Sequence, residues 1–159
     1  MGEELPESVY LELGKLIWDL IYLEDISRSL LVPIVDGSRF SSLDRLIEKA
    51  LRELDPNQHL DGIVRAKEWL GSVKKLLPIR NAIVHGTQCY FYPTLEDIKR
   101  HSSETPQVIE HVDKKGNLTR IEMNREYLAD LRERISTLSG EWVDVCLKLS
   151  ESLKLLKTD

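Results

Sequence analysis

The sequence is poor in the residues that define several large classes of protein. Only two cysteines, Cys89 and Cys146, occur among the 159 residues, and they form no CxxC unit. This excludes a disulfide-stapled scaffold and favours reduced thiols. No apolar run approaches the ~18 residues of a membrane span, and the acidic residues 1–5 lack the basic region of a secretory signal. We therefore expect a cytoplasmic protein without a membrane span.

A surplus of basic residues is also missing. The chain has 22 Lys and Arg against 27 Asp and Glu, which gives a net charge of −5. Proteins that hold long nucleic acids through their phosphates usually carry a basic surplus, so the balance argues against a general DNA-binding module. The balance does not exclude a nuclease that contacts nucleic acid over a small, local surface. The hydrophobic content of 42% and the length predict one ordinary globular domain over residues 1–159.

Motifs that bind cofactors or metals are absent. The sequence contains no Walker loop, dinucleotide fingerprint, zinc motif or nucleophile elbow. His59, His101 and His111 show no metal-ligand spacing, and we interpret them as surface residues. We therefore expect neither a cofactor nor a metal.

What the sequence does contain is apolar residues spaced three and four apart, which is typical of amphipathic helices. Pro78 interrupts the third of these segments and predicts a kinked extension to residue 86, where Gly86 closes the helix. The spacing predicts helices over residues 7–31, 41–54, 61–77 and 125–156.

Between the third and last helices the pattern changes. Residues 87–106 look irregular, with a short helix from Thr94 to His101. Valine, isoleucine and threonine on both sides of a glycine-containing turn predict a β-hairpin over about residues 108–123. The predicted fold class is therefore mainly α: an antiparallel helical bundle with a long C-terminal helix and one inserted β-hairpin.

The segment from Arg80 to Gly86 carries the most chemistry. It places a guanidinium, the Asn81 carboxamide and the His85 imidazole on an otherwise apolar stretch. In a helix Asn81 and His85 share a face, and we expect Ile83 and Val84 to pack toward the core. Imidazole transfers protons near neutral pH, and a guanidinium stabilises phosphoryl charge. These residues are a minimal set for cleaving a phosphodiester without a metal.

The Arg80-Asn81-Ala82-Ile83-Val84-His85 segment resembles the Arg-x4–6-His motif of HEPN (higher eukaryotes and prokaryotes nucleotide-binding) domains, in which Asn follows the Arg. The resemblance implies a helical bundle that forms homodimers. It also implies a metal-independent endoribonuclease of toxin–antitoxin or defence systems, with RNA as substrate and an antitoxin as a further partner. Arg80 and His85 would be catalytic, with Asn81 orienting or binding the substrate. Two such motifs would form one composite cleft.

Two observations limit the resemblance. Arg52 and His59 also satisfy the bare spacing, but they flank a predicted helix end and turn. One HEPN subclass carries a tyrosine two residues after the histidine, and that position is Thr87 here, so silencing by nucleotidylation of that tyrosine is not expected.

A structural role is the alternative for the same residues. Arg80 can serve as a cation near a helix C-terminus, His85 as a helix-end histidine bonded to a carbonyl, and Asn81 can compensate for the kink at Pro78. The chain would then be a non-catalytic HEPN-like interaction or sensor module that binds a partner protein or nucleotide. We expect its interface on the last helix, at Leu138, Trp142, Val145 and Leu149.

Overall fold

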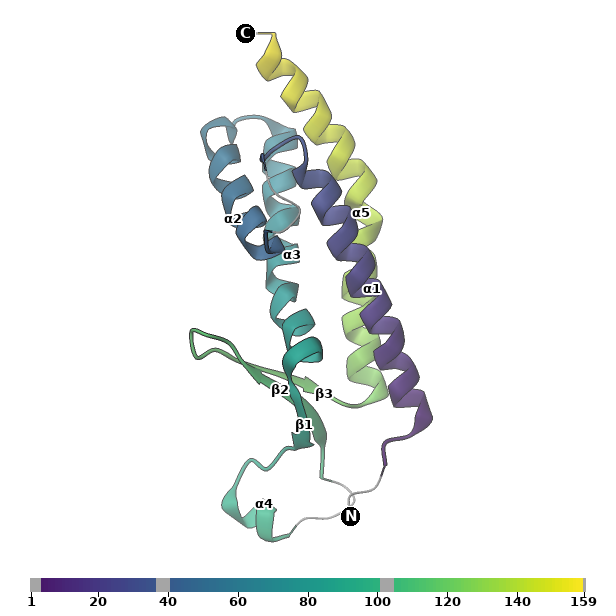
Figure 1. Ribbon diagram of the computed structural model, residues 1–159. Coiled ribbons are helices and arrows are strands. Elements are labelled where there is room, and N and C mark those ends of the chain that lie inside the picture. Colours follow the sequence, from purple (N-terminus) through teal and green to yellow (C-terminus); the bar gives the residue numbers. More distant parts are fainter. Residues whose placement is uncertain (1–3, 37–40, 101–104, 159) are drawn as a thin grey trace. The chain divides into compact units, whose positions relative to one another are not determined.

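The computed structural model describes residues 4–36, 41–100 and 105–158, and the chain is mainly helical with a small antiparallel sheet (Figure 1). The four long segments predicted as helices are helical to within a few residues of their predicted ends. In chain order, the elements are α1 (Glu7–Leu31), α2 (Leu43–Leu54), the 3-10 turn η1 (Asp55–Asn57), α3 (Asp61–His85), β1 (Thr87–Tyr90), α4 (Leu95–Lys99), β2 (Gln107–Val112), β3 (Leu118–Glu122) and α5 (Arg125–Lys157).

The chain divides into two compact units. Unit 1 comprises Met1–Trp18 and Pro78–Glu133, and unit 2 comprises Asp19–Leu77 and Arg134–Asp159. Helices α1, α3 and α5 each contribute residues to both units. Within the described ranges, no helix combines the length and apolarity that crossing a bilayer would require.

The regular elements among the described residues of unit 2 are helices, and polar contacts join α3 to α5 inside it. The Gly62 amide donates a hydrogen bond to Ser152 Oγ over 3.0 Å. The indole N–H of Trp69, a buried residue, donates to the Leu138 carbonyl over 2.9 Å. The amphipathic α2 begins at the N-cap Ser42. It buries one stripe of side chains, as its spacing predicts: Leu43, Leu46, Ile47, Ala50 and Leu54.

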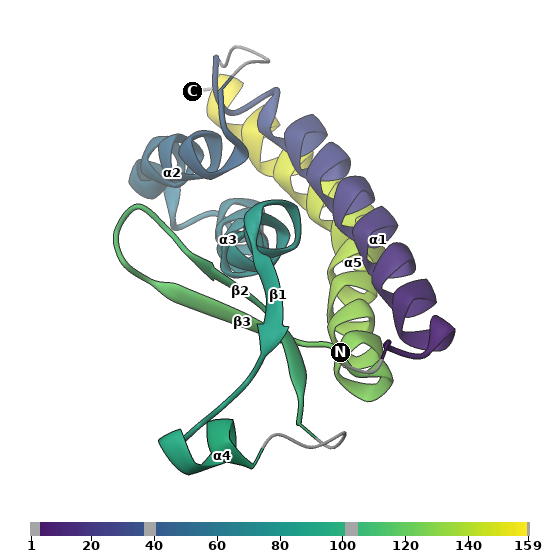
Figure 2. The same cartoon turned by 60° about the horizontal axis from the view of Figure 1, so that its bottom comes forward.

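Unit 1 is built around a three-stranded antiparallel sheet in the order β1-β2-β3 (Figure 2). The predicted hairpin is present as β2 and β3, but residues 87–90, predicted to be irregular, form the third strand. Thr87 pairs with Glu110 and Tyr90 with Gln107. The sequence does not predict this strand, because it is short and lacks an alternating apolar pattern. Its hydrogen bonds with β2 make these residues a strand. The short helix α4 ends at Lys99, and the predicted end at His101 lies outside the described residues.

The hairpin turn has a physical basis in its own residues. Gly116 adopts φ +84°, the left-handed conformation that glycine tolerates best. The Asp113 carboxylate accepts hydrogen bonds from the amides of Lys115 and Asn117, over 2.8 and 2.9 Å. The bonds from Asn117 are the main cause of a lowered pKa for Asp113. This turn fixes the register of β2 on β3.

A buried carboxylate joins α1 to α5 inside unit 1. The Glu12 side chain is 12% exposed, and Arg132 Nη1 donates to Glu12 Oε2 over 3.0 Å. The hydrogen bond from Arg132 is the main cause that lowers the pKa of Glu12, and Lys15 adds to it. A carboxyl with a lowered folded-state pKa stabilises the fold above its unfolded pKa, and this contribution disappears as the pH falls through the folded-state pKa.

We therefore expect Glu12→Gln to reduce stability near neutral pH and to matter less in acid. The measurement is the urea midpoint of both proteins at about pH 7 and about pH 3, on either side of the normal range of a carboxyl. The exposed Glu7→Gln on the same helix is the control. A difference between wild type and Glu12→Gln that is equal at both pH values would contradict this assignment.

Candidate functional site

The last turns of α3 carry Arg80, Asn81 and His85. Helix α3 is continuous through Pro78 to His85, so the segment extends the third helix. The expectation that Val84 packs toward the core is wrong, because Val84 is 57% exposed. Ala82 is fully buried instead. The helix therefore buries the face of Ala82 and leaves His85 exposed to solvent.

Arg80 and Asn81 are half-buried neighbours. Arg80 Nη1 donates a hydrogen bond to Asn81 Oδ1 over 3.3 Å. Asn81 lies one helical turn before His85, so the two share a helix face, as the sequence predicts. Neither Arg80 nor His85 is buried, and both side chains have access to solvent.

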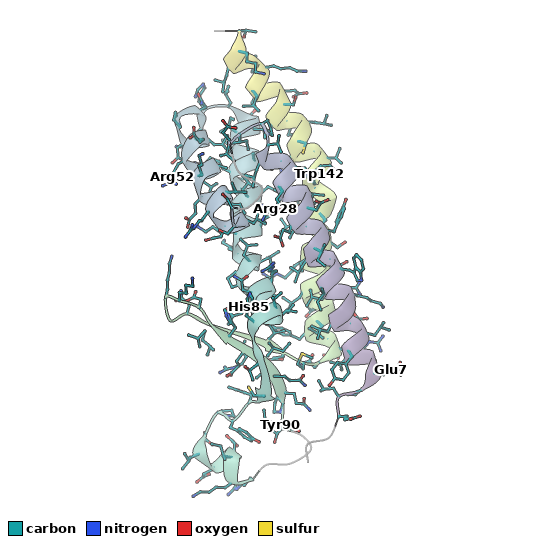
Figure 3. The ribbon with its side chains drawn as sticks, in the orientation of Figure 1. Glu7, Arg28, Arg52, His85, Tyr90 and Trp142 are labelled. Carbon is teal, nitrogen blue, oxygen red and sulfur yellow. The ribbon has the colours of Figure 1, made fainter. Side chains whose placement is uncertain are left out.

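A second histidine lies beside His85. The ring centroids of His85 and His111 are 6.1 Å apart, and the ring planes are tilted by 38°. His111 is on β2 and half-buried, and its ring contact with His85 was not predicted from the sequence. Figure 3 shows His85 at the end of α3, next to the β2–β3 hairpin. Sequence spacing gives no sign of this pair, because the fold brings β2 to the end of α3.

Gly86 holds the end of α3 close to β2. A Cβ atom at this position would lie 2.2 Å from the Ala82 carbonyl oxygen and 2.6 Å from Ile109 Cγ2. It would also lie 2.9 Å from the Glu110 carbonyl oxygen. The predicted helix end at Gly86 is correct, but its φ lies outside the left-handed region. The glycine is required by space, and this close approach sets His85 near His111.

The sequence around Arg80 and His85 carries no acidic residue, whereas Glu110 precedes His111 on β2. The sequence contains no Asp or Glu between Glu68 and Glu96, the stretch that includes Arg80, Asn81 and His85 but not His111. Glu110, next to His111, accepts a hydrogen bond from Arg120 Nε over 2.7 Å and is neutralised by it. Arg120 also lies 4.0 Å above the Phe91 ring.

The two thiols are poor nucleophiles. Burial raises the pKa of both Cys89 and Cys146, and for Cys89 the neighbouring Glu110 carboxylate raises it further. A thiol with a raised pKa is mostly protonated near neutral pH and therefore unreactive. Across residues 4–36, 41–100 and 105–158, no group of three or more metal-ligating side chains comes together.

Other candidate residues do not assemble into a site. Arg52 and His59, which share the bare motif spacing, flank η1 and are both exposed. Val145 and Leu149, expected at an interface on α5, are fully buried and are therefore part of the core of unit 2. Unit 2 has a pocket of about 250 Å³ lined by residues that include Leu30, Cys146 and Leu153. Leu149 is among the residues that line this pocket, whereas Arg80, Asn81 and His85 are not.

The chain matches no protein-family model, no curated protein and no solved structure. What the structure defines is a mainly helical protein with a small three-stranded antiparallel sheet. Its candidate site consists of Arg80, Asn81, His85 and His111.

Proposed function

We propose that this chain is a metal-independent endoribonuclease of the HEPN toxin or defence type. The observation that supports this most is the pair of imidazoles, His85 and His111, 6.1 Å apart at the end of the helix that carries Arg80 and Asn81. Cleavage of RNA through its own 2′-hydroxyl needs a base, an acid and a cation, and these residues supply all three.

The reaction balances without a metal, an oxidant or a reductant. A neutral imidazole accepts the proton of the 2′-hydroxyl, and the 2′-oxygen forms a bond to phosphorus. A protonated imidazole donates to the 5′-oxygen as the bond from phosphorus to that oxygen breaks. Arg80 stabilises the charge on the pentavalent phosphorane, and Asn81 orients His85 or the phosphate. The products are a 2′,3′-cyclic phosphate and a 5′-hydroxyl.

There are two candidates for the second imidazole, His111 of the same chain and His85 of a second chain. The HEPN resemblance implies a homodimer in which two Arg80/His85 sets face each other across one cleft. His111 supplies a second imidazole within the same chain. Each acting ring nitrogen must lie within ~2.6–3.2 Å of its own oxygen. Two rings whose centroids are 6.1 Å apart can satisfy this at two oxygens of one phosphodiester.

Cleavage of mixed RNAs in the presence of EDTA tests the proposal. We expect the wild type to cut and to leave 2′,3′-cyclic ends. His85→Ala should lower the rate by about 10²–10⁴-fold, because it removes an acid or base. His59→Ala, at another exposed histidine, is the matched control. Loss of activity in EDTA, or wild-type cleavage by His85→Ala, would contradict the mechanism.

Two further measurements identify the source of the second imidazole. If it is His111, His111→Ala should lose activity about as strongly as His85→Ala. Excess His85→Ala protein mixed with wild type should then leave the wild-type rate unchanged. If a composite cleft acts, His111→Ala should cut normally, and excess His85→Ala chain should suppress wild-type cleavage by forming mixed dimers.

A second candidate function is a non-catalytic HEPN-like interaction or sensor module. The observation that favours it is the number of large apolar side chains that α1 leaves exposed. Such a module would bind an antitoxin or another partner protein, or a nucleotide, and it would leave RNA intact under all the conditions above.

A further inference from the structure

The pocket of unit 2 lies where helix α1 ends beside α5. Helix α1 ends at Leu31, and Pro33 helps to end it, because a proline disfavours the helical conformation of the residue before it. Helix α5 continues as a regular helix to Lys157 (Figure 1). One face of α5 forms most of the pocket wall, since its lining residues recur at steps of three and one. These residues are Cys146, Leu149, Ser150, Leu153, Lys154 and Lys157.

The inner part of the pocket is apolar. Leu30 and Leu149 are buried, and Cys146 and Leu153 are half-buried. Burial raises the pKa of Cys146, so its thiol is protonated near neutral pH and packs like a small apolar side chain. Water finds few hydrogen-bond partners in such a space, and an apolar group replaces it favourably. The inner part of the pocket therefore suits a hydrocarbon chain.

The mouth of the pocket is basic. Lys154 and Lys157 are exposed, and no ion pair joins either ammonium group to a carboxylate within residues 4–36, 41–100 and 105–158. No aspartate or glutamate is among the described residues that line the pocket. The C-terminal ends of α1 and α5 each contribute about −0.5 charge, which is less in sum than the two full charges of the lysines. The mouth therefore favours an anionic head group.

The volume of the pocket limits the size of its ligand. The pocket holds about 250 Å³. An apolar cavity of ~150 Å³ takes one benzene, or about 25 Å³ per carbon, so this pocket has room for about ten carbon atoms. Its wall extends over eleven steps of α5, from Cys146 to Lys157, which is ~16 Å at ~1.5 Å per residue. The space is therefore elongated, as an unbranched chain requires.

We propose that this pocket binds a free monocarboxylate with an unbranched chain of about eight to ten carbon atoms. The chain lies against Leu30, Leu149 and Leu153. The carboxylate accepts hydrogen bonds from the ammonium groups of Lys154 and Lys157, which act as flexible point charges at the mouth. All these residues belong to unit 2, and none of them takes part in the proposed cleavage of RNA.

Isothermal titration calorimetry of the full chain with decanoate tests this site. We expect one site per chain and a dissociation constant of about 10–100 µM, which is the affinity that a ligand of this size reaches. Decyltrimethylammonium has the same chain and the opposite charge, and it should bind at least tenfold more weakly. Equal affinity for the two compounds, or no binding of decanoate at millimolar concentration, would overturn the proposal.

A double variant tests the head group. Lys154→Gln combined with Lys157→Gln should raise the dissociation constant for decanoate about threefold to tenfold, because each exposed ion pair contributes little. Lys114→Gln combined with Lys115→Gln makes the same charge change at exposed lysines of the hairpin and is the matched control. Equal effects of the two double variants would show attraction by net charge alone and overturn the role of the lysines at the mouth.

The thiol in the wall tests the place of the chain. In the wild type, saturating decanoate should slow the reaction of Cys146 with a small thiol reagent at least fivefold. Cys89, in unit 1, is the internal control and should react at an unchanged rate. Cys146→Phe should fill the pocket and abolish binding with an unchanged helical circular dichroism spectrum. Unchanged reactivity of Cys146 in decanoate would overturn the site, whether or not Cys146→Phe folds. Because no measurement contains RNA, the result is independent of the proposed catalysis.

Discussion

Gly62→Ala is expected to unfold unit 2 at much lower denaturant than wild type. A Cβ atom on residue 62 would lie 1.9 Å from the Lys148 carbonyl oxygen and 2.4 Å from Ser152 Oγ. The first of these atoms is helix backbone, so α3 and α5 must separate locally. Overpacking of this kind costs about 3 kcal/mol or more. The separation would also break the hydrogen bond from the Gly62 amide to Ser152, worth about 1 kcal/mol.

Gly71→Ala on the same helix is the matched control. A Cβ atom there would meet nothing within 4 Å, and alanine is favoured over glycine inside a helix. We expect this variant to gain up to about 1 kcal/mol. Urea unfolding followed by circular dichroism measures both variants. Similar shifts of both midpoints in the same direction would show that helix propensity, and not the contact with α5, determines the effect.

The helices could be predicted because their burial follows their spacing. On α2, the residues that the spacing predicts to face the core are buried from Leu43 to Leu54, except Leu51, which is half-buried. The third strand could not be predicted, since Thr87 to Tyr90 carry no strand pattern of their own and gain their hydrogen bonds from β2. Local patterns identify elements that bury one side of themselves. They do not reveal a short strand whose partner lies elsewhere in the chain.

Spacing also fails to tell which apolar face is internal. On α5 the residues expected to bind a partner include Val145 and Leu149, and both are core residues. On α1 the same kind of spacing describes two faces, and Trp18 lies on the exposed one. A three- and four-residue repeat states only that a face is apolar. Whether this chain or another chain covers that face depends on the tertiary structure.

Part of the candidate site could be predicted from the sequence. Arg80, Asn81 and His85 stand together in the sequence, and the helix places Asn81 and His85 on one face. His111 was not readable, because its position next to His85 depends on the junction between α3 and β2. The glycine at position 86 is the one feature of the sequence that could have pointed to this junction. A glycine at a helix end permits close approach of another backbone, as well as ending the helix.

Gly86→Ala is therefore expected to damage the fold and the histidine pair together. The added Cβ atom meets the Ala82 carbonyl oxygen, Ile109 Cγ2 and the Glu110 carbonyl oxygen, all within 3 Å. The Ile109 and Glu110 atoms belong to β2, so β2 must move away from α3, and the contact with the Ala82 carbonyl oxygen requires the end of α3 itself to shift. We expect a loss of about 2–3 kcal/mol in unfolding free energy. The nuclear Overhauser effect between the rings of His85 and His111 should also disappear.

Gly140→Ala, at a helical glycine with open space around its Cβ position, is the control and should keep both the stability and the ring contact. The comparison also tests the chemistry. If His111 is the second imidazole, Gly86→Ala should lose RNA cleavage even under conditions where it is fully folded, because catalytic groups displaced by about 1 Å lose on the order of 10²-fold in rate. A folded Gly86→Ala protein that keeps the ring contact would show that the α3–β2 junction does not set the distance between His85 and His111.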